Sequence, residues 1–218
     1  MDTLNNQQIL DAGLVDWRKL EHALHARFAG SDFRELARFI SAVADAAEAA
    51  DHHPDVRLTY GVVDVSVCSH DAGMNITNRD IDLATEISQI AAQHGLAADP
   101  SSVTQLELAL DTAHKDRVAP FWSALLTGAA DNLVDGTVVD SSGRVPQVWF
   151  QGSEEHEGPR QRWHLDLWLP PETVDERVAA AVAAGGALLR DESAATFTVL
   201  ADPDGNRVCI CFATGRES

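Results

Sequence analysis

The 218-residue sequence contains little cysteine, little basic charge and no long run of apolar residues. Its three cysteines, Cys68, Cys209 and Cys211, are too few and too unevenly placed for a disulfide framework, so we expect reduced thiols. No apolar stretch approaches the roughly 20 residues that cross a bilayer, which excludes a membrane-spanning helix. The first residues lack the basic start and the apolar stretch of a secretory signal, and we therefore expect a cytoplasmic protein.

The charge balance is strongly acidic. Only 16 Lys and Arg residues face 34 Asp and Glu residues, which gives a formal net charge of −18. Such a charge repels phosphate backbones and anionic membranes, and no local basic patch offsets it. We therefore expect no nucleic-acid partner and no membrane partner. With 45% hydrophobic residues, the chain has an ordinary globular composition, and its length suits two small cores or one medium core.

A long helix is expected after residue 31. Asp32 and Glu35 have the spacing of a helix-capping pattern, and five apolar residues then recur at helical spacing. These five are Phe33, Leu36, Ile40, Val43 and Ala47. Because Pro54 disfavours helical geometry at the residue before it, the helix should end near Ala50 and leave residues 51–53 as its exit turn.

Three further elements are expected before residue 96. Residues 62–70 alternate between valines and polar residues, which predicts a half-buried strand that ends at His70 on its polar face. Thr77 is a suitable N-cap for a second helix, and Gly95 is a suitable residue to end it. The pattern of residues 14–29 is less regular, and we expect a hairpin there.

The second half contains a weak internal repeat. Residues 96–102 are rich in turn formers and are interpreted as a nearly structureless linker between a domain at 1–95 and a domain at 103–218. After this linker, Leu106–Leu110 is echoed by Leu165–Leu169, and in each copy a strand pattern leads into a helix pattern and further strand patterns. Two copies of a βαβββ unit fit this half.

Three of the nine histidines stand apart from the others. His52 and His53 lie where a helix must break, and His70 ends the expected strand, so all three can project toward one open side of a sheet. Imidazoles titrate near neutral pH and suit proton transfer. The alternatives are a helix C-terminal pair favoured by the macrodipole, a surface residue at a strand end, and a metal site. No carboxylate or thiolate completes a recognisable metal-ligand spacing.

The spacing of these histidines resembles the signature of the pterin-4a-carbinolamine dehydratase family. The residues that carry the resemblance are Glu48, His52-His53-Pro54, Tyr60, His70 and Asp80, and the likeness covers roughly residues 4–95. It implies an α+β fold in which helices cover one face of an antiparallel sheet. Where family members often carry Trp after the His-His-Pro-acid run, this chain has Val56-Arg57, so the wall of the pterin site differs on that side.

The resemblance also implies an activity. Family members remove water from 4a-hydroxytetrahydropterin to give quinonoid dihydropterin, in tetrahydropterin recycling after aromatic amino-acid hydroxylation. It implies that His52 and His70 are the acid/base pair and that His53 orients the substrate or shares the transfer. The residues implied to bind the substrate are Asp51, Cys68, Ser69 and Asp80. For Asp80, a favourable acid in the first turn of a helix is an equally good explanation.

The partners follow from the same resemblance. The pterin is the expected substrate, and no metal and no other cofactor is expected. The expected protein partner is an aromatic amino-acid hydroxylase, whose pterin cofactor the reaction regenerates. A homo-oligomer is also expected.

Residues 103–214 resemble the glyoxalase-like branch of the vicinal-oxygen-chelate superfamily. The strings that carry this resemblance are residues 121–126, 163–167 and 200–206. The positions that hold metal in metal-dependent members correspond here to Gln105, Gln151, His164 and Cys209. This set is poor for a hard divalent ion, although a Cys209 thiolate with His164 would suit zinc.

Strand parity predicts a polar-lined cup in the second domain. It places seven residues on matching faces: Gln105, Glu107, His164, Asp166, Trp168, Cys209 and Cys211. Three functions remain open for the whole chain. They are a metal-free dehydratase, a non-catalytic dimerisation or cofactor protein, and a small-molecule binding or lyase activity in the glyoxalase-like domain, whose cup could equally be degenerate and serve only packing.

Overall fold

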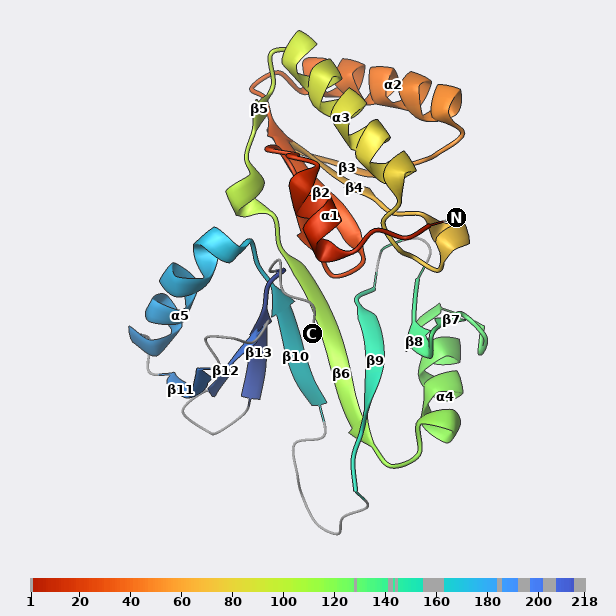
Figure 1. Ribbon diagram of the computed structural model, residues 1–218, viewed down its shortest axis with the longest axis vertical. Helices are drawn as coiled ribbons and strands as arrows, with labels where there is room; N and C mark the ends of the chain where they lie inside the picture. Colours follow the sequence, from red (N-terminus) through yellow and green to blue (C-terminus); the bar gives the residue numbers. More distant parts are fainter. Residues whose placement is uncertain are drawn as a thin grey trace. The chain divides into compact units, whose positions relative to one another are not determined.

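The computed structural model describes residues 2–127, 129–140, 143, 145–154, 163–183, 186–191, 197–201 and 207–213 (Figure 1). The chain divides into two compact units. The first contains Met1–Thr104 with two short later segments, and the second contains Gln105–Leu169 and Thr173–Phe212. Within the described ranges, no helix combines the length and the apolar character that a bilayer crossing requires.

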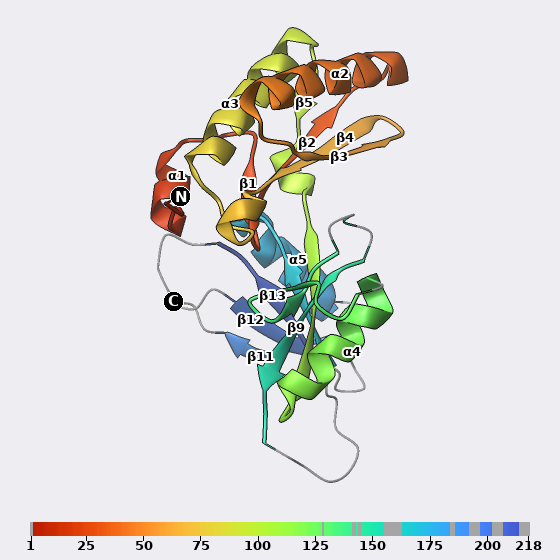
Figure 2. The same ribbon diagram turned by 90° about the vertical axis from the view of Figure 1, so that its right-hand side faces the viewer.

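The first unit is an antiparallel sheet with two long helices over one face (Figures 1 and 2). The strands run in the order β1-β2-β4-β3, and β5 pairs with β2 beside β1. The elements are α1 (Asn6–Asp11), β1 (Arg18–Leu20), β2 (Ala23–Ala29), α2 (Phe33–Ala50), β3 (Asp55–Thr59), β4 (Val62–Val67), the short 3₁₀ helix η1 (His70–Ala72), α3 (Asn78–Gln93), β5 (Ala97–Ala98) and the 3₁₀ helix η2 (Pro100–Ser102).

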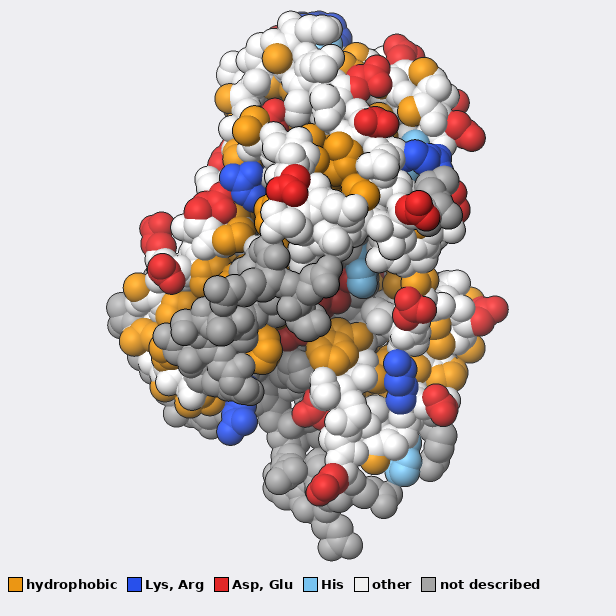
Figure 3. Space-filling view, viewed as in Figure 1, with side chains coloured by type: hydrophobic (Ala, Val, Ile, Leu, Met, Phe, Trp, Pro, Cys, Tyr) orange, Lys and Arg blue, Asp and Glu red, His pale blue; other side chains and the backbone are white. Residues whose placement is uncertain are grey.

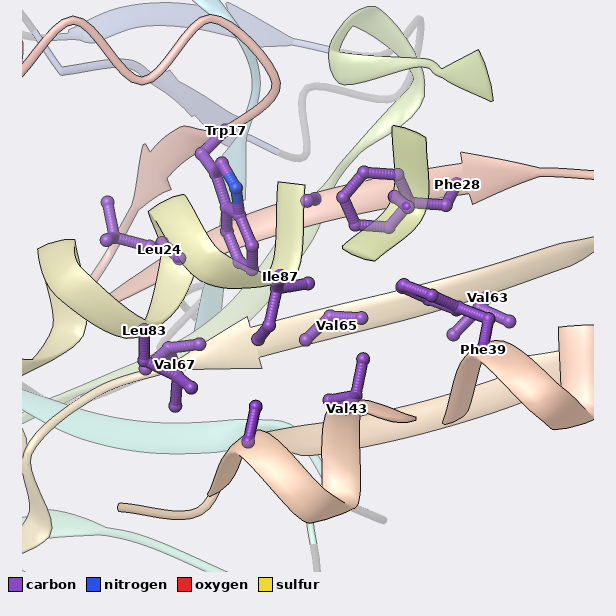
Figure 4. Packing of buried hydrophobic residues seen from close by; sticks show 14 of the residues in the cluster. Trp17, Leu24, Phe28, Phe39, Val43, Val63, Val65, Val67, Leu83 and Ile87 are labelled. Carbon is purple, nitrogen blue, oxygen red and sulfur yellow. The ribbon is translucent and has the colours of Figure 1, made fainter. Parts of the chain in front are cut away.

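Alternation in the strands builds the core of the first unit. Phe28 of β2 and Val65 of β4 face the helices, and Phe39 of α2 and Ile87 of α3 meet them there (Figure 4). All four side chains are buried. The rings of Phe28 and Phe39 meet edge to face with centroids 5.4 Å apart. Because the sheet is apolar on this face and the helices are apolar on one side only, their packing fixes which side of each helix is buried.

The expected helix boundaries are confirmed. Asp32 accepts a hydrogen bond from the Arg34 backbone N–H, and α2 ends at Ala50. Thr77 caps α3, and Gly95, with φ +67°, follows the C-cap residue. The hairpin expected within residues 14–29 is the pair β1 and β2.

Four details differ from the expectations. Phe33 is half exposed, whereas Phe39, which the apolar pattern did not include, is fully buried in the core. Strand β4 ends at Val67 rather than His70, because Ser69 bridges to Asn75 and the chain turns through η1 and Gly73, whose φ is +71°. Segment 96–102 is not structureless, since β5 and η2 occupy it. Elements α1 and β3 were not predicted; β3 is a largely exposed edge strand and lacks the alternation of burial that marks β4.

The second unit contains the two expected βαβββ copies. The first is β6 (Gln105–Thr112), α4 (Lys115–Thr127), β7 (Leu133–Val134), β8 (Thr137–Val138) and β9 (Gln147–Gly152). The second is β10 (Trp163–Trp168), α5 (Val174–Ala183), β11 (Ala187–Asp191), β12 (Phe197–Ala201) and β13 (Arg207–Cys211). The 3₁₀ helix η3 (Pro171–Thr173) lies between β10 and α5 in the chain, and its first two residues belong to the first unit. Together they form one sheet in the order β11-β12-β13-β10-β6-β9-β8-β7.

The two copies are arranged alike around the β6–β10 pair. These strands are antiparallel to each other, whereas β6 runs parallel to β9 and β10 runs parallel to β13. Each helix packs on its own half of the sheet: Ala119 of α4 lies in a cluster with Val148 and Phe150, and Val174 of α5 lies in a cluster with Leu200 and Ile210. The fold class is therefore α+β, as the sequence predicts.

Acidic side chains are spread over the face that Figure 3 shows, rather than gathered in one patch. This distribution agrees with the formal net charge of −18.

Candidate active site

The exit turn of α2 places His52 inside the first unit. Asp51, the C-cap residue, adopts the left-handed conformation at φ 47° and ψ 42°, which reverses the chain direction. The His52 backbone N–H then donates to the carbonyl of Ala47 at 3.1 Å. As a result the His52 side chain is only 7% exposed, whereas the next residue, His53, keeps 58% of its side chain exposed.

Asp80 holds the His52 ring. Its carboxylate is completely buried, and its Oδ1 atom lies 2.7 Å from His52 Nε2. Because a carboxylate accepts, the His52 proton lies on Nε2, and Nδ1 is the basic nitrogen of the neutral ring. The other oxygen, Oδ2, accepts from Ser69 Oγ at 2.7 Å and from the backbone N–H and the hydroxyl of Thr77 at 2.7 and 2.9 Å.

The capping of α3 explains why the sequence places Asp80 there. Thr77 and Asp80 are the N-cap and N3 residues of a capping box, in which each side chain meets the other's backbone. The positive end of the helix dipole also favours a carboxylate in the first turn. One side chain therefore both begins α3 and binds a histidine 28 residues earlier in the chain.

The other two histidines are open to solvent. His53 Nε2 lies 3.2 Å from Oε1 of Glu48, whose side chain is 80% exposed. His70 is exposed and is the first residue of η1, directly after the buried Ser69. The three histidines therefore come from two segments, and Asp80 binds a residue of each: His52 in one and Ser69 in the other.

The expected substrate-binding residues have different surroundings. Asp51 is exposed and Cys68 is 7% exposed. Burial, followed by the nearby Asp80 and Asp55, raises the pKa of the Cys68 thiol to about 12, so this side chain is a neutral thiol at physiological pH. Ser69 and Asp80 are completely buried; Asp80 binds the His52 ring, and Ser69 donates to Asp80.

One residue of the family signature and one basic residue complete the description. Tyr60 is 96% exposed at the turn between β3 and β4. Arg79, which no sequence pattern singled out, donates to the Asp51 carbonyl at 2.5 Å and to the Asp71 carboxylate at 3.1 Å. A cation in the first turn of a helix opposes the helix dipole, and this is the signal in the sequence that could have identified it.

The polar face that strand parity predicts in the second unit has the expected register. Asp166 pairs with Glu107 on one side and with Cys209 on the other. Glu107 and Asp166 are both buried, with 6% and 7% of the residue surface exposed. Each accepts from an indole: Trp168 Nε1 donates to Glu107 at 2.6 Å, and Trp149 Nε1 donates to Asp166 at 2.9 Å.

The candidate metal-ligand positions on this polar face have different surroundings. Burial, followed by the Asp166 charge, raises the pKa of Cys209 to about 11, and burial raises the pKa of Cys211 as well. Gln151 is exposed and Gln105 is half-buried. Over the described part of the chain, no three His, Cys, Asp or Glu side chains are grouped to hold a metal. The side chain of His164 and residues 202–206 lie outside the described part.

The fold and the site together define a protein with a buried His–Asp pair in a helix-covered antiparallel sheet, followed in the chain by a paired βαβββ domain. The family model described as pterin 4 alpha carbinolamine dehydratase matches residues 2–90, and the model described as glyoxalase-like domain matches residues 107–211. The chain belongs to the pterin-4a-carbinolamine dehydratase family and carries a glyoxalase-like domain after it.

Individual relatives match the first unit. A "Putative pterin-4-alpha-carbinolamine dehydratase" of Rhodopseudomonas palustris strain HaA2 is 44% identical over 93 residues, which cover 42% of this chain and 90% of the relative. A protein of the same name from Koribacter versatilis is 39% identical over 90 residues, or 40% of this chain and 95% of the relative. A solved transcriptional coactivator/pterin dehydratase from Brucella melitensis is 30% identical, with a TM-score of 0.40, over 41% of this chain and 99% of that one.

Proposed function

We propose that the first unit dehydrates a 4a-hydroxytetrahydropterin to the quinonoid dihydropterin. The observation that supports this proposal best is the buried hydrogen bond between Asp80 and His52, beside two exposed histidines. A carboxylate that binds one imidazole nitrogen fixes the tautomer and stabilises the imidazolium form when the other nitrogen takes a proton. His52 is thus equipped for proton transfer rather than only for packing.

The reaction requires two proton movements. The hydroxyl group on C4a leaves as water only if it receives a proton, and the electron pair that replaces the C4a–O bond comes from a ring nitrogen that loses a proton. The products are therefore one water and one dihydropterin, with no net oxidation. We assign these transfers to His52 and His70, and we assign substrate orientation or a share of the transfer to His53.

Proton transfer alone accounts for this chemistry, so the proposal includes no metal and no second cofactor. We place the pterin between the His52–His53 segment and the His70 segment, with Asp51 and the neutral Cys68 thiol beside it. Ser69 and Asp80 act through His52. An aromatic amino-acid hydroxylase is the proposed source of the substrate, and a homo-oligomer is the proposed assembly.

The experiment follows the absorbance change as 4a-hydroxytetrahydropterin is dehydrated by the purified full-length chain. His52→Ala and His70→Ala should each lower kcat by about 100-fold or more, since positioned acid/base groups contribute roughly that much. His53→Ala should have a smaller effect. His114→Ala, an exposed histidine of the second unit, is the matched control and should leave the rate unchanged.

Equal rates for the wild-type protein, His52→Ala and His70→Ala would contradict the assignment. A wild-type protein with no activity above the uncatalysed rate would favour the alternative of a dimerisation or cofactor protein that acts through contacts. For the second unit we propose no reaction, because the buried carboxylates of its polar face are already bound by the indoles of Trp149 and Trp168.

A further inference from the structure

Arg79 connects the two histidine-bearing segments of the proposed site. One guanidinium nitrogen, Nη2, donates to the backbone carbonyl of Asp51, the residue before His52. The other, Nη1, donates to the carboxylate of Asp71, the residue after His70. The planar fork of an Arg side chain fixes the directions of these two hydrogen bonds relative to each other.

Arg79 and its neighbour Asp80 act on the same two segments. Both residues belong to the first turn of α3, as its second and third residues. Asp80 binds the His52 ring and the Ser69 hydroxyl. Arg79 binds Asp51, which precedes His52, and Asp71, which follows His70. A single helix turn therefore makes four hydrogen bonds that tie the His52–His53 segment to the Ser69–His70 segment.

Neither helix formation nor the ion pair with Asp71 explains Arg79. A positive charge in the first turn is unfavourable for the helix, so the residue does not serve α3 itself. The side chains of Arg79 and Asp71 are 33% and 59% exposed, and an ion pair this exposed adds little to folding stability. Asp51, whose carbonyl Arg79 binds, has a positive φ, a conformation that costs energy for a residue other than glycine and needs support from its surroundings.

We propose that Arg79 is a positioning residue that holds the His52–His53 segment and the His70 segment at a fixed separation. Its effect on the rate rests on the dehydratase function proposed above. Arg79 touches the segments outside the imidazole rings, so it orients the groups that transfer protons and takes no part in the transfer. Misplacing such groups by about 1 Å is enough to cost up to roughly 100-fold in rate.

The test compares Arg79→Lys with the wild-type full-length chain. Lysine keeps the charge but has one nitrogen, and it cannot reproduce two hydrogen bonds made from separate nitrogens. We expect kcat to fall by about 10-fold with KM nearly unchanged, because positioning of the acid and base is lost rather than substrate binding. The unfolding midpoint should stay close to that of the wild type.

A second measurement is independent of activity. The His52 amide donates to the Ala47 carbonyl and the Gly73 amide donates to the His70 carbonyl, so both report on the order of the two segments. In Arg79→Lys, both amides should exchange hydrogen about 10-fold faster or more, while amides in the middle of α2 keep their rates. Arg38→Lys is the control, since Arg38 also pairs with a carboxylate, that of Glu35 within α2, and it should change neither rate nor exchange.

Asp71→Asn tests the second of the two Arg79 contacts, the hydrogen bond to the Asp71 carboxylate. It should lower kcat by less than Arg79→Lys does, because it leaves the hydrogen bond from Arg79 to the Asp51 carbonyl in place. Unchanged kcat together with unchanged exchange in Arg79→Lys would overturn the proposal. A loss of activity without faster exchange in both segments would overturn it too, because Arg79 would then act on the substrate directly. If the wild-type protein is inactive, the proposed function fails, and hydrogen exchange alone then tests the positioning role of Arg79. Faster exchange at both the His52 and Gly73 amides in Arg79→Lys supports that role. Unchanged exchange at either amide overturns it.

Discussion

The Oδ1 atom of Asp80 lies 2.7 Å from the Nε2 atom of His52, and both side chains are withdrawn from solvent. The remaining oxygen of Asp80 is saturated by donors from Ser69 and Thr77. A carboxylate held by this many donors is fixed in place, where its charge can stabilise a positive charge on the imidazole it binds. The same contact joins the start of α3 to the end of α2.

Asp80→Asn tests this contact. The amide has nearly the same size but no charge, and it can meet His52 with either a donor or an acceptor, so the tautomer of the ring is no longer specified. We expect kcat for dehydration to fall by about 100-fold or more. The free energy of unfolding should also fall by about 1–3 kcal/mol, because buried donors lose a charged acceptor.

Asp82→Asn is the control for that variant. Asp82 lies in the same helix, two residues later, and is exposed. Its substitution should leave both the dehydration rate and the denaturant midpoint as they are in the wild type. An Asp80→Asn protein with wild-type kcat would show that the imidazole does not depend on the carboxylate.

Two phenylalanines of α2 should differ sharply in their contribution to stability. Phe39 is fully buried between β2, β4 and α3, and Phe39→Ala should lower the free energy of unfolding by about 3–5 kcal/mol through lost burial and the cavity left behind. Phe33 is 52% exposed, and Phe33→Ala should cost less than about 1 kcal/mol. Urea unfolding of the two variants checks this, and similar losses would show that α2 packs with a different face toward the sheet.

His25 should make the first unit less stable in acid. Burial lowers its pKa from 6.5 to about 4, although the Asp64 charge acts in the opposite direction. Between pH 6.5 and about 4 the unfolded chain binds a proton that the folded chain does not, so stability is complete above pH 6.5 and falls as the pH is lowered through this range. The loss reaches about 1–3 kcal/mol near pH 4.

His25→Gln removes this titration. The difference in unfolding free energy between pH 7 and pH 4.5 should shrink in the variant relative to the wild type, as measured by urea unfolding at both pH values. His114→Gln, at an exposed position in the second unit, should keep the wild-type difference. If His25→Gln and the wild type lose equal stability over this interval, the histidine is not the group responsible.

The three cysteines should resist thiol reagents in the folded protein. Cys68 and Cys209 have pKa values raised to about 12 and about 11, and the pKa of Cys211 is raised as well, in each case mainly by burial. Because only the thiolate reacts, labelling by iodoacetamide at pH 8 should be slower than that of a free thiol by about 100-fold or more. Mass spectrometry should find all three labelled after unfolding in guanidinium chloride; fast labelling of folded Cys68 would contradict the assigned burial.

Much of the local structure can be predicted from the sequence. The caps at Asp32 and Thr77, the helix break before Pro54 and the valine alternation of β4 each depend on residues a few positions apart, so local stereochemistry specifies them. The repeated βαβββ pattern predicts the second unit in the same way, because strands and helices of a repeat have the same periodicities. The histidine spacing identifies the family.

Contacts between distant residues were decided only by the tertiary structure. The sequence predicts Asp80 as a helix-capping acid equally well as a site residue, and only the packing of α3 against the exit turn of α2 brings it to His52. The burial of Phe39 instead of Phe33 and the hydrogen bonds of Arg79 have the same origin. Hydrophobic burial is not directional and acts across the whole unit, so it selects one among several locally acceptable helix faces, and that choice determines which polar groups meet.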